Sequence, residues 1–300
     1  MKSAFELLTV IDLKNLKNAR KIIADIKNIS YENVVFSSKN VFLDTIELQK
    51  FSNMFARLNQ GEPISKIIGK KGFWKHEFFV DENVLDPRPE TELIIESVLA
   101  RFADNMELPL HFLDIGTGSG CILLSLLSEF KNAMGIGIDI SKKAIAIAKK
   151  NKEQLEMDRA TFINIGWNEI LNADNNITNA DRKVMDMNID MNIDVIVSNP
   201  PYICTDEIKS LDENVRKYDP KIALDGGIDG LEKYREITIV AKEILQKSNA
   251  QNKNKYIFLE VGYNQADDVK NLLKKNNFKN IVSEKDLNGI DRVVIARSAD

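Results

Sequence analysis

Near the start of the chain, apolar residues recur at the spacing of an amphipathic helix. The first series comprises Leu13, Leu16, Ala19, Ile22, Ile23 and Ile26, and the second comprises Val41, Ile46, Leu48, Phe51, Met54, Phe55 and Leu58. These series predict a small helical domain over residues 1–60. From Gly61 to Pro89 the pattern changes to glycine, proline and short aromatic or β-branched runs. This change predicts a β-hairpin linker over residues 61–89.

After this linker, short β-rich runs alternate with helical patterns, beginning with a helix expected over Glu90 to Arg101. The expected strands are Leu110 to Ile115, Met134 to Asp139, Ala160 to Ile165, Ile193 to Ser198, Lys255 to Glu260, Lys279 to Ser283 and Asp291 to Ala296. Such alternation is typical of a mainly parallel sheet covered by helices on both faces. Because the polar link around Asn288 and Gly289 is too short for a helix, the last two strands must be antiparallel to each other.

The predicted fold class is α/β, with a methyltransferase-type Rossmann-like sheet over residues 90–300 and a small N-terminal helical domain. Parallel strands closed by an antiparallel C-terminal hairpin distinguish such a sheet from a dinucleotide-binding one. Within this domain, residues 172–190 are rich in Asn, Asp and Met. We expect them to form a surface insertion.

Composition narrows the class of protein further. A hydrophobic fraction of 44% and a mean hydropathy of -0.24 are ordinary for a soluble globular protein. The net charge of -4 argues against a protein that coats nucleic acid, so no stable nucleic-acid partner is expected. Glu6 and Asp12 interrupt the N-terminal apolar stretch, and no apolar run is long enough for a membrane span. We therefore expect a cytoplasmic protein. Cys121 and Cys204 lack metal-ligand spacing, so no metal site is expected.

A glycine-rich run, Ile-Gly-Thr-Gly-Ser-Gly, follows the first expected strand of the sheet and precedes a helix. In an α/β sheet this is the position of a nucleotide site. Gly116, Gly118 and Gly120, together with Thr117, allow the backbone to turn sharply and approach a ligand closely. Their spacing fits a phosphate cradle less well than the dinucleotide fingerprint does. The run therefore predicts a nucleotide ligand without pyrophosphate.

Three side chains near this run complete the predicted cofactor site. Asp139 ends the next strand, where a carboxylate can accept hydrogen bonds from both ribose hydroxyls of an adenosine. Asp114 is placed to meet the cationic amino-acid part of S-adenosylmethionine, directly or through water. Trp167 is either an aromatic wall near the adenine or a core residue. The predicted cofactor is S-adenosyl-L-methionine, with S-adenosyl-L-homocysteine as the product.

The tetrad Asn199, Pro200, Pro201 and Tyr202 lies at the carboxyl end of the fourth expected strand, beside the cofactor site. The nitrogen of an amide is a poor nucleophile because its lone pair is delocalised into the carbonyl group. Two acceptors, the Asn199 side-chain oxygen and the Pro200 backbone oxygen, can orient both N–H bonds and aim the lone pair at a sulfonium methyl. Tyr202 would stack on the planar substrate group. The tetrad therefore predicts a methyltransferase acting on a planar nitrogen, with Asn199 bordering the cofactor as well.

Further motifs accompany the tetrad. They are Leu-Asp-Pro-Arg-Pro-Glu-Thr-Glu over residues 85–92, Asp-Gly-Gly-Ile-Asp-Gly-Leu over residues 225–231, and Leu-Glu-Val-Gly over residues 259–262. Together these motifs resemble the HemK-type (PrmC) glutamine methyltransferases that act on peptide chain release factors, and the likeness covers nearly the whole chain.

The resemblance implies methylation of the side-chain amide of the glutamine in the Gly-Gly-Gln loop of a release factor. It also implies that the N-terminal helical domain contacts this protein partner. Arg88 and Glu90 are expected to shape the mouth of the substrate pocket. One position departs from the family pattern, because Gly166 stands where an acidic residue usually precedes the tryptophan.

Other functions remain open at this point. A glutamine of a ribosomal protein is a related substrate, and an exocyclic amino group of DNA or RNA is also planar and needs the same two acceptors. An adenosine-binding protein without catalysis is the non-enzymatic alternative. An oxidoreductase fits the glycine spacing and the terminal hairpin least well.

Overall fold

The computed structural model describes residues 1–170, 192–248 and 254–299. The chain divides into two compact units, Met1–Lys70 and Lys71–Asp300. The division falls inside the 61–89 segment expected to be a linker, so this segment is shared between the units. The insertion expected over residues 172–190 lies outside the described residues. No described helix is both long and apolar enough to cross a membrane.

The first unit is helical, as the two apolar series predict. Its helices are α1 (Ala4–Leu8), α2 (Leu13–Lys27), α3 (Tyr31–Ser37), α4 (Thr45–Asn59) and α5 (Ile64–Ile68), with the 3-10 turn η1 (Ser38–Asn40) after α3. Strand β1 (Lys2–Ser3) pairs antiparallel with β2 (Phe42–Leu43). The buried core includes Ile22, Ile23, Leu43 and Phe51. Asp44 caps α4 through a reciprocal pair of hydrogen bonds with Glu47, which satisfies amide groups that the first helical turn leaves free.

The second unit is built on a seven-stranded sheet with the order β10-β11-β9-β8-β5-β6-β7. The strands are β5 (His111–Ile115), β6 (Met134–Asp139), β7 (Ala160–Asn164), β8 (Val195–Ser198), β9 (Tyr256–Glu260), β10 (Lys279–Lys285) and β11 (Asp291–Arg297). Strands β5 to β9 pair in parallel, whereas β11 pairs antiparallel with both β9 and β10. The prediction of a parallel sheet closed by an antiparallel hairpin is confirmed.

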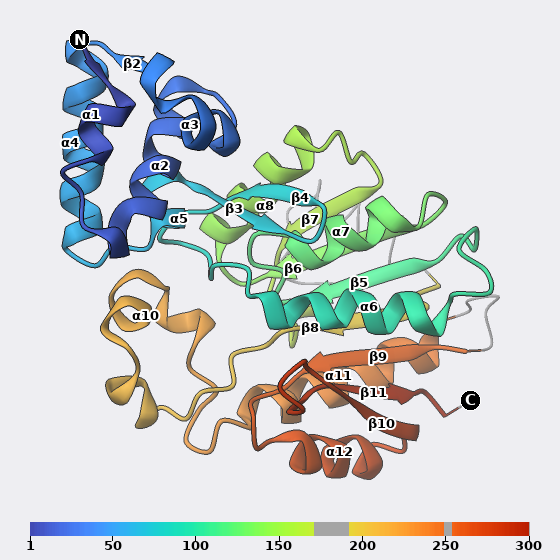
Figure 1. Ribbon diagram of the computed structural model, residues 1–300. Helices are drawn as coiled ribbons and strands as arrows, with labels where there is room; N and C mark the ends of the chain where they lie inside the picture. Colours follow the sequence, from blue (N-terminus) through green and yellow to red (C-terminus); the bar gives the residue numbers. More distant parts are fainter. Residues whose placement is uncertain (171–191, 249–253, 300) are drawn as a thin grey trace. The chain divides into compact units, whose positions relative to one another are not determined.

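Helices cover both faces of this sheet (Figure 1). One core layer contains residues of α6 (Glu92–Arg101), α7 (Cys121–Glu129) and α8 (Lys142–Gln154). The opposite layer contains residues of α11 (Glu232–Lys247) and α12 (Ala266–Lys275). Adjacent strand residues serve opposite layers, as Phe112 and Leu113 do. Because both faces are buried, the strands read as nearly continuous apolar runs.

Shorter elements connect the longer helices and strands. They are β3 (Lys70–Phe73), β4 (His76–Phe79), η2 (Pro89–Thr91), η4 (Glu207–Ser210), α10 (Glu213–Tyr218) and η5 (Lys221–Ala223). The expected hairpin is formed by β3 and β4. The Asn151 side chain of α8 accepts a hydrogen bond from the Phe79 N–H over 2.7 Å and donates one to the Phe79 carbonyl over 3.1 Å. These two bonds fix the start of the segment that leads to η2.

Candidate active site

The loop after β5 turns through three glycines with positive φ angles, 73° at Gly116, 54° at Gly118 and 79° at Gly120. A Cβ atom at Gly118 would meet no atom within 4 Å, and one at Gly116 would meet only Trp167, at 4.0 Å. At Gly120 the same atom would lie 2.8 Å from the ring of Phe162. The first two glycines therefore face open space that a ligand can enter, while Gly120 packs against the core.

A cavity of about 380 Å³ lies at the carboxyl ends of β5, β6 and β8. Among the residues expected in the site, its lining includes Arg88, Gly116, Thr117, Gly118, Asp139, Trp167, Asn199 and Pro201. The expected residues outside the lining are Glu90, Asp114, Gly120, Pro200 and Tyr202. The glycine loop and two residues of the tetrad, Asn199 and Pro201, thus border the same cavity.

Asp139 presents a largely buried carboxylate at the end of β6. Its oxygens accept hydrogen bonds from the N–H groups of Gly118, over 3.0 Å, and Ser141, over 2.8 Å. Burial raises the pKa of Asp139, and these two bonds oppose that rise. Each carboxylate oxygen keeps a further lone pair. The group can therefore accept additional hydrogen bonds from a diol in the cavity.

Asp114 is fully buried beneath the glycine loop. Its Oδ2 atom accepts a hydrogen bond from the Thr117 hydroxyl over 2.6 Å. Burial raises the pKa of Asp114 to about 7, although hydrogen bonds from Thr117 and the Leu123 amide lower it. Thr117 lines the cavity and Asp114 does not, so Asp114 contacts the cavity wall through the threonine.

Trp167 borders the cavity and packs against the core layer of α11 and α12. Its indole N–H donates to Glu236 Oε2 over 2.7 Å, and Asn168 Nδ2 donates to the same oxygen over 3.1 Å. The two interpretations offered for this tryptophan are therefore compatible. Beside it, the Gly166 N–H donates to Glu169 Oε2 over 3.1 Å. An acidic side chain thus borders the cavity here, although residue 166 is a glycine.

The Asn199 side chain has a defined hydrogen-bond donor and a free acceptor. Its Nδ2 atom donates to the Thr91 hydroxyl oxygen over 3.1 Å. No described residue donates a hydrogen bond to Asn199 Oδ1 or to the Pro200 carbonyl oxygen. Asn199 therefore offers an acceptor at the cavity, and the adjacent carbonyl offers a second one.

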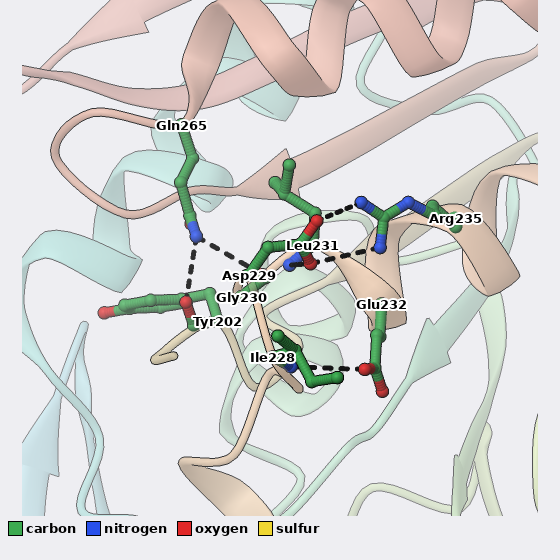
Figure 2. Close-up of polar contacts among 8 residues, drawn as sticks. All are labelled: Tyr202, Ile228, Asp229, Gly230, Leu231, Glu232, Arg235 and Gln265. Carbon is green, nitrogen blue, oxygen red and sulfur yellow. Dashed lines mark hydrogen bonds and ion pairs between the residues drawn. The ribbon is translucent and has the colours of Figure 1, made fainter. Parts of the chain in front are cut away.

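The main chain of Tyr202 is held by Gln265, as Figure 2 shows. Gln265 Nε2 donates to the carbonyl oxygens of Tyr202, over 2.9 Å, and Gly230, over 3.2 Å. Its Oε1 atom accepts from the Gly262 N–H over 3.0 Å. Burial, assisted by the charge of Glu260, raises the pKa of Tyr202 to about 12. The phenol is therefore neutral at physiological pH, and its ring is fixed from the backbone side.

The glycine-containing motif of residues 225–231 packs directly against this tyrosine. A Cβ atom at Gly226 would lie 2.7 Å from the Tyr202 Cα, and one at Gly230 would lie 2.5 Å from its carbonyl oxygen. Asp229 of the motif forms an ion pair with Arg235 of α11 (Figure 2). Only glycine allows the two backbones to approach so closely.

Arg88 joins two parts of the cavity wall. Its guanidinium donates to Asp219 Oδ2 over 2.7 Å, and the Asp219 side chain is only 5% exposed. Asp219 is followed by the lining residues Pro220, Ile222 and Ala223. This contact is consistent with the expected role of Arg88 at the pocket mouth. Glu90 is exposed. Burial raises the pKa of Glu260, and the charge of Glu90 adds to this rise.

Comparison with known proteins decides the family. A family model described as a methyltransferase domain matches residues 109–286. The release factor glutamine methyltransferase of Caulobacter vibrioides is 38% identical over 254 residues, which cover 84% of this chain and 79% of that protein. The protein of the same name from Agrobacterium fabrum is 34% identical and covers 94% of this chain and 90% of its own length. This chain belongs to the release factor glutamine methyltransferase family.

The family resemblance inferred from the motifs is thereby confirmed. Among solved structures, the catalytic domain of hMettl16 in complex with a MAT2A 3'UTR hairpin is 15% identical, with a TM-score of 0.54. The match covers 87% of this chain and 84% of that one. At this identity the likeness shows a shared methyltransferase fold alone.

Four side chains of this family member border the cavity or support its walls without having been predicted: Thr91, Glu236, Glu260 and Gln265. Thr91 lies inside the proline-rich motif, and Glu260 ends an apolar strand beside the tetrad strand. The sequence therefore contained a signal for both residues, because each lies in or directly after a segment that the motifs already marked. Glu236 and Gln265 lie near the starts of α11 and α12, where nothing in the sequence pattern distinguishes them from ordinary surface residues.

Proposed function

We propose that this protein transfers a methyl group from S-adenosyl-L-methionine to the side-chain amide nitrogen of the glutamine in the Gly-Gly-Gln motif of peptide chain release factors. The observation that carries the proposal is the pair of free acceptors, Asn199 Oδ1 and the Pro200 carbonyl, at the end of β8. Asn199 lines the cavity that the glycine loop also lines, and Pro200 is the next residue of the chain. Family membership supplies the class of protein substrate.

The residues of the cavity fit the proposed cofactor. Open space above Gly116 and Gly118 leaves room for a ligand close to the backbone. Asp139 would accept the ribose hydroxyls, and Trp167, held by Glu236, would border the adenine. Asp114 would orient the Thr117 hydroxyl near the amino-acid part. When bound, S-adenosylmethionine supplies an electrophilic methyl group on a positively charged sulfur.

The tetrad would act on the substrate by positioning it. Asn199 Oδ1 and the Pro200 carbonyl would each accept one N–H bond of the glutamine amide, which aims the nitrogen lone pair along the line of displacement. Tyr202 would provide a neutral aromatic wall against the flat amide. Transfer of the methyl group would release S-adenosylhomocysteine as a neutral thioether and leave an acidic, positively charged nitrogen, which would lose a proton to solvent. The two acceptors stabilise the positive charge that develops on the nitrogen.

A competition between substrates tests the proposal. Purified protein is incubated with S-adenosylmethionine labelled in the methyl group and with a release factor, a ribosomal protein preparation or nucleic acid. We expect label in the release factor, removable by protease and resistant to nuclease. Label only in the ribosomal protein or only in the nucleic acid would establish the corresponding alternative, and cofactor binding without transfer to any of them would favour the non-catalytic alternative.

A further inference from the structure

Strand β9 ends in a buried acid that the proposed transfer does not use. Glu260 is only 3% exposed, and within the described part of the chain no hydrogen-bond partner reaches its Oε2 atom. The parallel register pairs Ser198 of β8 with Leu259 of β9. The next residues, Asn199 and Glu260, consequently lie side by side at the carboxyl ends of the two strands. A buried carboxylate with an unpaired oxygen atom is costly, so a role for Glu260 beside the tetrad is worth testing.

Thr91 links this acid to the tetrad. It is 3% exposed, lies at the end of η2 and accepts the hydrogen bond from Asn199 Nδ2 over 3.1 Å. A hydroxyl has one proton and two lone pairs, so a threonine that accepts from Asn199 keeps its proton for another acceptor. Burial raises the pKa of the Glu260 carboxyl, whereas the Thr91 hydroxyl and the Asn199 amide, which can each donate to a carboxylate, lower it.

The charge of Glu260 favours one orientation of the Asn199 side-chain amide. An ionised carboxylate can only accept, so it turns the Thr91 proton and the Asn199 amide protons toward itself. If the Asn199 amide rotated by half a turn, its oxygen would face the Glu260 carboxylate and the Thr91 proton would be drawn away from that carboxylate. The orientation with Nδ2 toward Thr91 and Oδ1 free is therefore favoured.

We propose that Glu260 and Thr91 are positioning residues that fix the side-chain amide of Asn199 with its oxygen free to accept from the substrate nitrogen. This inference rests on the proposed function, because it takes Asn199 Oδ1 as a substrate acceptor. It adds two residues from η2 and β9 that do not touch the reacting atoms.

Charged and titratable groups from several elements face Glu260. Burial raises the pKa of Glu260 to about 7 and the charge of Glu90 adds to this rise, whereas Thr91, Arg292 of β11 and Asn199 lower it. Burial raises the pKa of three neighbours, and the charge of Glu260 adds to each rise: Cys121 of α7, Tyr202 and Tyr234 of α11. Protonation lets Glu260 donate, so the amide of Asn199 loses its preferred orientation. Methyl transfer should therefore fall as the pH drops through about 7.

A set of near-isosteric variants tests the inference. Thr91→Val removes the hydroxyl, Thr91→Ser keeps it, and Glu260→Gln removes the charge. The matched control is Thr238→Val, because Thr238 is a fully buried threonine of α11 that also accepts from an asparagine, Asn276 Nδ2, over 3.1 Å. For each variant, kcat and KM for a release factor are measured across pH, together with the Kd of S-adenosylhomocysteine and the thermal unfolding temperature.

We expect Thr91→Val to lower kcat by about 30-fold with little change in KM or in the Kd, because only the orientation of an acceptor is lost. Thr91→Ser should recover most of this loss, and Thr238→Val should change kcat by less than about twofold. Glu260→Gln should lower kcat by roughly tenfold at pH 8 and remove the decline at acidic pH. If Thr91→Val unfolds, the inference is tested by the pH dependence of kcat in Glu260→Gln.

Three outcomes would overturn the inference. They are wild-type kcat in Thr91→Val, equal losses in Thr91→Val and Thr238→Val, and an acidic limb that persists in Glu260→Gln. A wild-type protein that leaves the release factor unmodified would instead overturn the proposed function, and the inference with it. If the wild-type protein modifies the release factor and the Thr91 and Glu260 variants do so equally well, the inference is overturned but the proposed function stands.

Discussion

The proposed cofactor end and the proposed transfer end of the cavity contain similar groups but are assembled differently. Each has a carboxyl group whose pKa is raised by burial to about 7 and lowered in part by a threonine hydroxyl, Thr117 for Asp114 and Thr91 for Glu260. The first pair is three residues apart within one strand and its loop. The second joins η2 to the end of β9 across the tertiary fold.

This difference teaches how the two ends respond to change. The glycine loop is set by local backbone geometry and by hydrogen bonds to the neighbouring strand, so it can form once β5 and β6 pair. The transfer end needs η2, the end of β8, the 225–231 motif and the start of α12 to meet. We therefore expect variants at the cofactor end to change affinity, and variants at the transfer end to change kcat.

The largest effect is expected for Asn199→Ala. Loss of one of two acceptors for the substrate nitrogen should lower kcat by about 1000-fold. The Kd of S-adenosylhomocysteine, measured by calorimetry, should change by less than about threefold, because the cofactor is held mainly by the other end. The control Asn276→Ala removes an asparagine with a similar threonine contact and should retain activity. An Asn199→Ala protein with wild-type kcat would contradict the division into two ends.

Asp139→Ala tests the opposite end. Asp139 accepts from the Gly118 N–H and is proposed to accept the two ribose hydroxyls, so its removal should raise the Kd of S-adenosylhomocysteine by about 100-fold. At saturating cofactor, kcat should recover to within about fivefold of wild type. An Asp139→Ala protein with unchanged Kd and strongly reduced kcat would contradict the assignment of Asp139 to cofactor binding.

Gln265→Leu tests the hydrogen bonds that hold the main chain at Tyr202. The Tyr202 and Gly230 carbonyl oxygens lose a shared donor, so kcat should fall by about tenfold and stability by about 2 kcal/mol. Gln265 does not line the cavity, and the cofactor Kd should stay unchanged. Steady-state kinetics and urea unfolding measure the two effects. Unaltered kcat together with the expected stability loss would restrict Gln265 to a purely structural role.

The smallest effect concerns the two buried carboxyls and the pH dependence of stability. Burial raises the pKa of Asp114 from 3.8 and of Glu260 from 4.5, in both cases to about 7. The folded state then binds more protons than the unfolded state, so this stabilisation is complete below pH 4 and is lost as the pH rises to about 7. Asp114→Asn and Glu260→Gln should each flatten the decline of the unfolding free energy over this range. Equal slopes in wild type and both variants would contradict these pKa directions.

Local sequence pattern predicted the fold well for a physical reason. Strands buried on both faces give apolar runs that end where polar residues begin, and the short link around Gly289 allows only a hairpin. The glycine loop and the tetrad were predictable for the same reason, because each directly follows such a strand. The helices α1, α3 and α5 were not predicted, since each is only five to seven residues long and gives little periodic signal.

Contacts between distant segments could not be predicted from pattern alone. Nothing in the sequence states that Thr91 meets Asn199 or that Gln265 meets Tyr202, because these contacts depend on how η2 and α12 pack against the sheet. Sequence also could not separate Gly120, which packs on Phe162, from Gly116 and Gly118, which face open space. The glycine spacing is the same for both roles.

The central claim is that Asn199 enables methyl transfer to a release factor glutamine, and peptide mass spectrometry tests it most directly. A release factor is incubated with cofactor and either the wild-type protein or Asn199→Ala, and the peptide containing Gly-Gly-Gln is then fragmented. The account predicts the added mass of one methylene group on the side chain of that glutamine with the wild type, and almost none with the variant. An unmodified glutamine with the wild type, or equal modification by the two proteins, would contradict it.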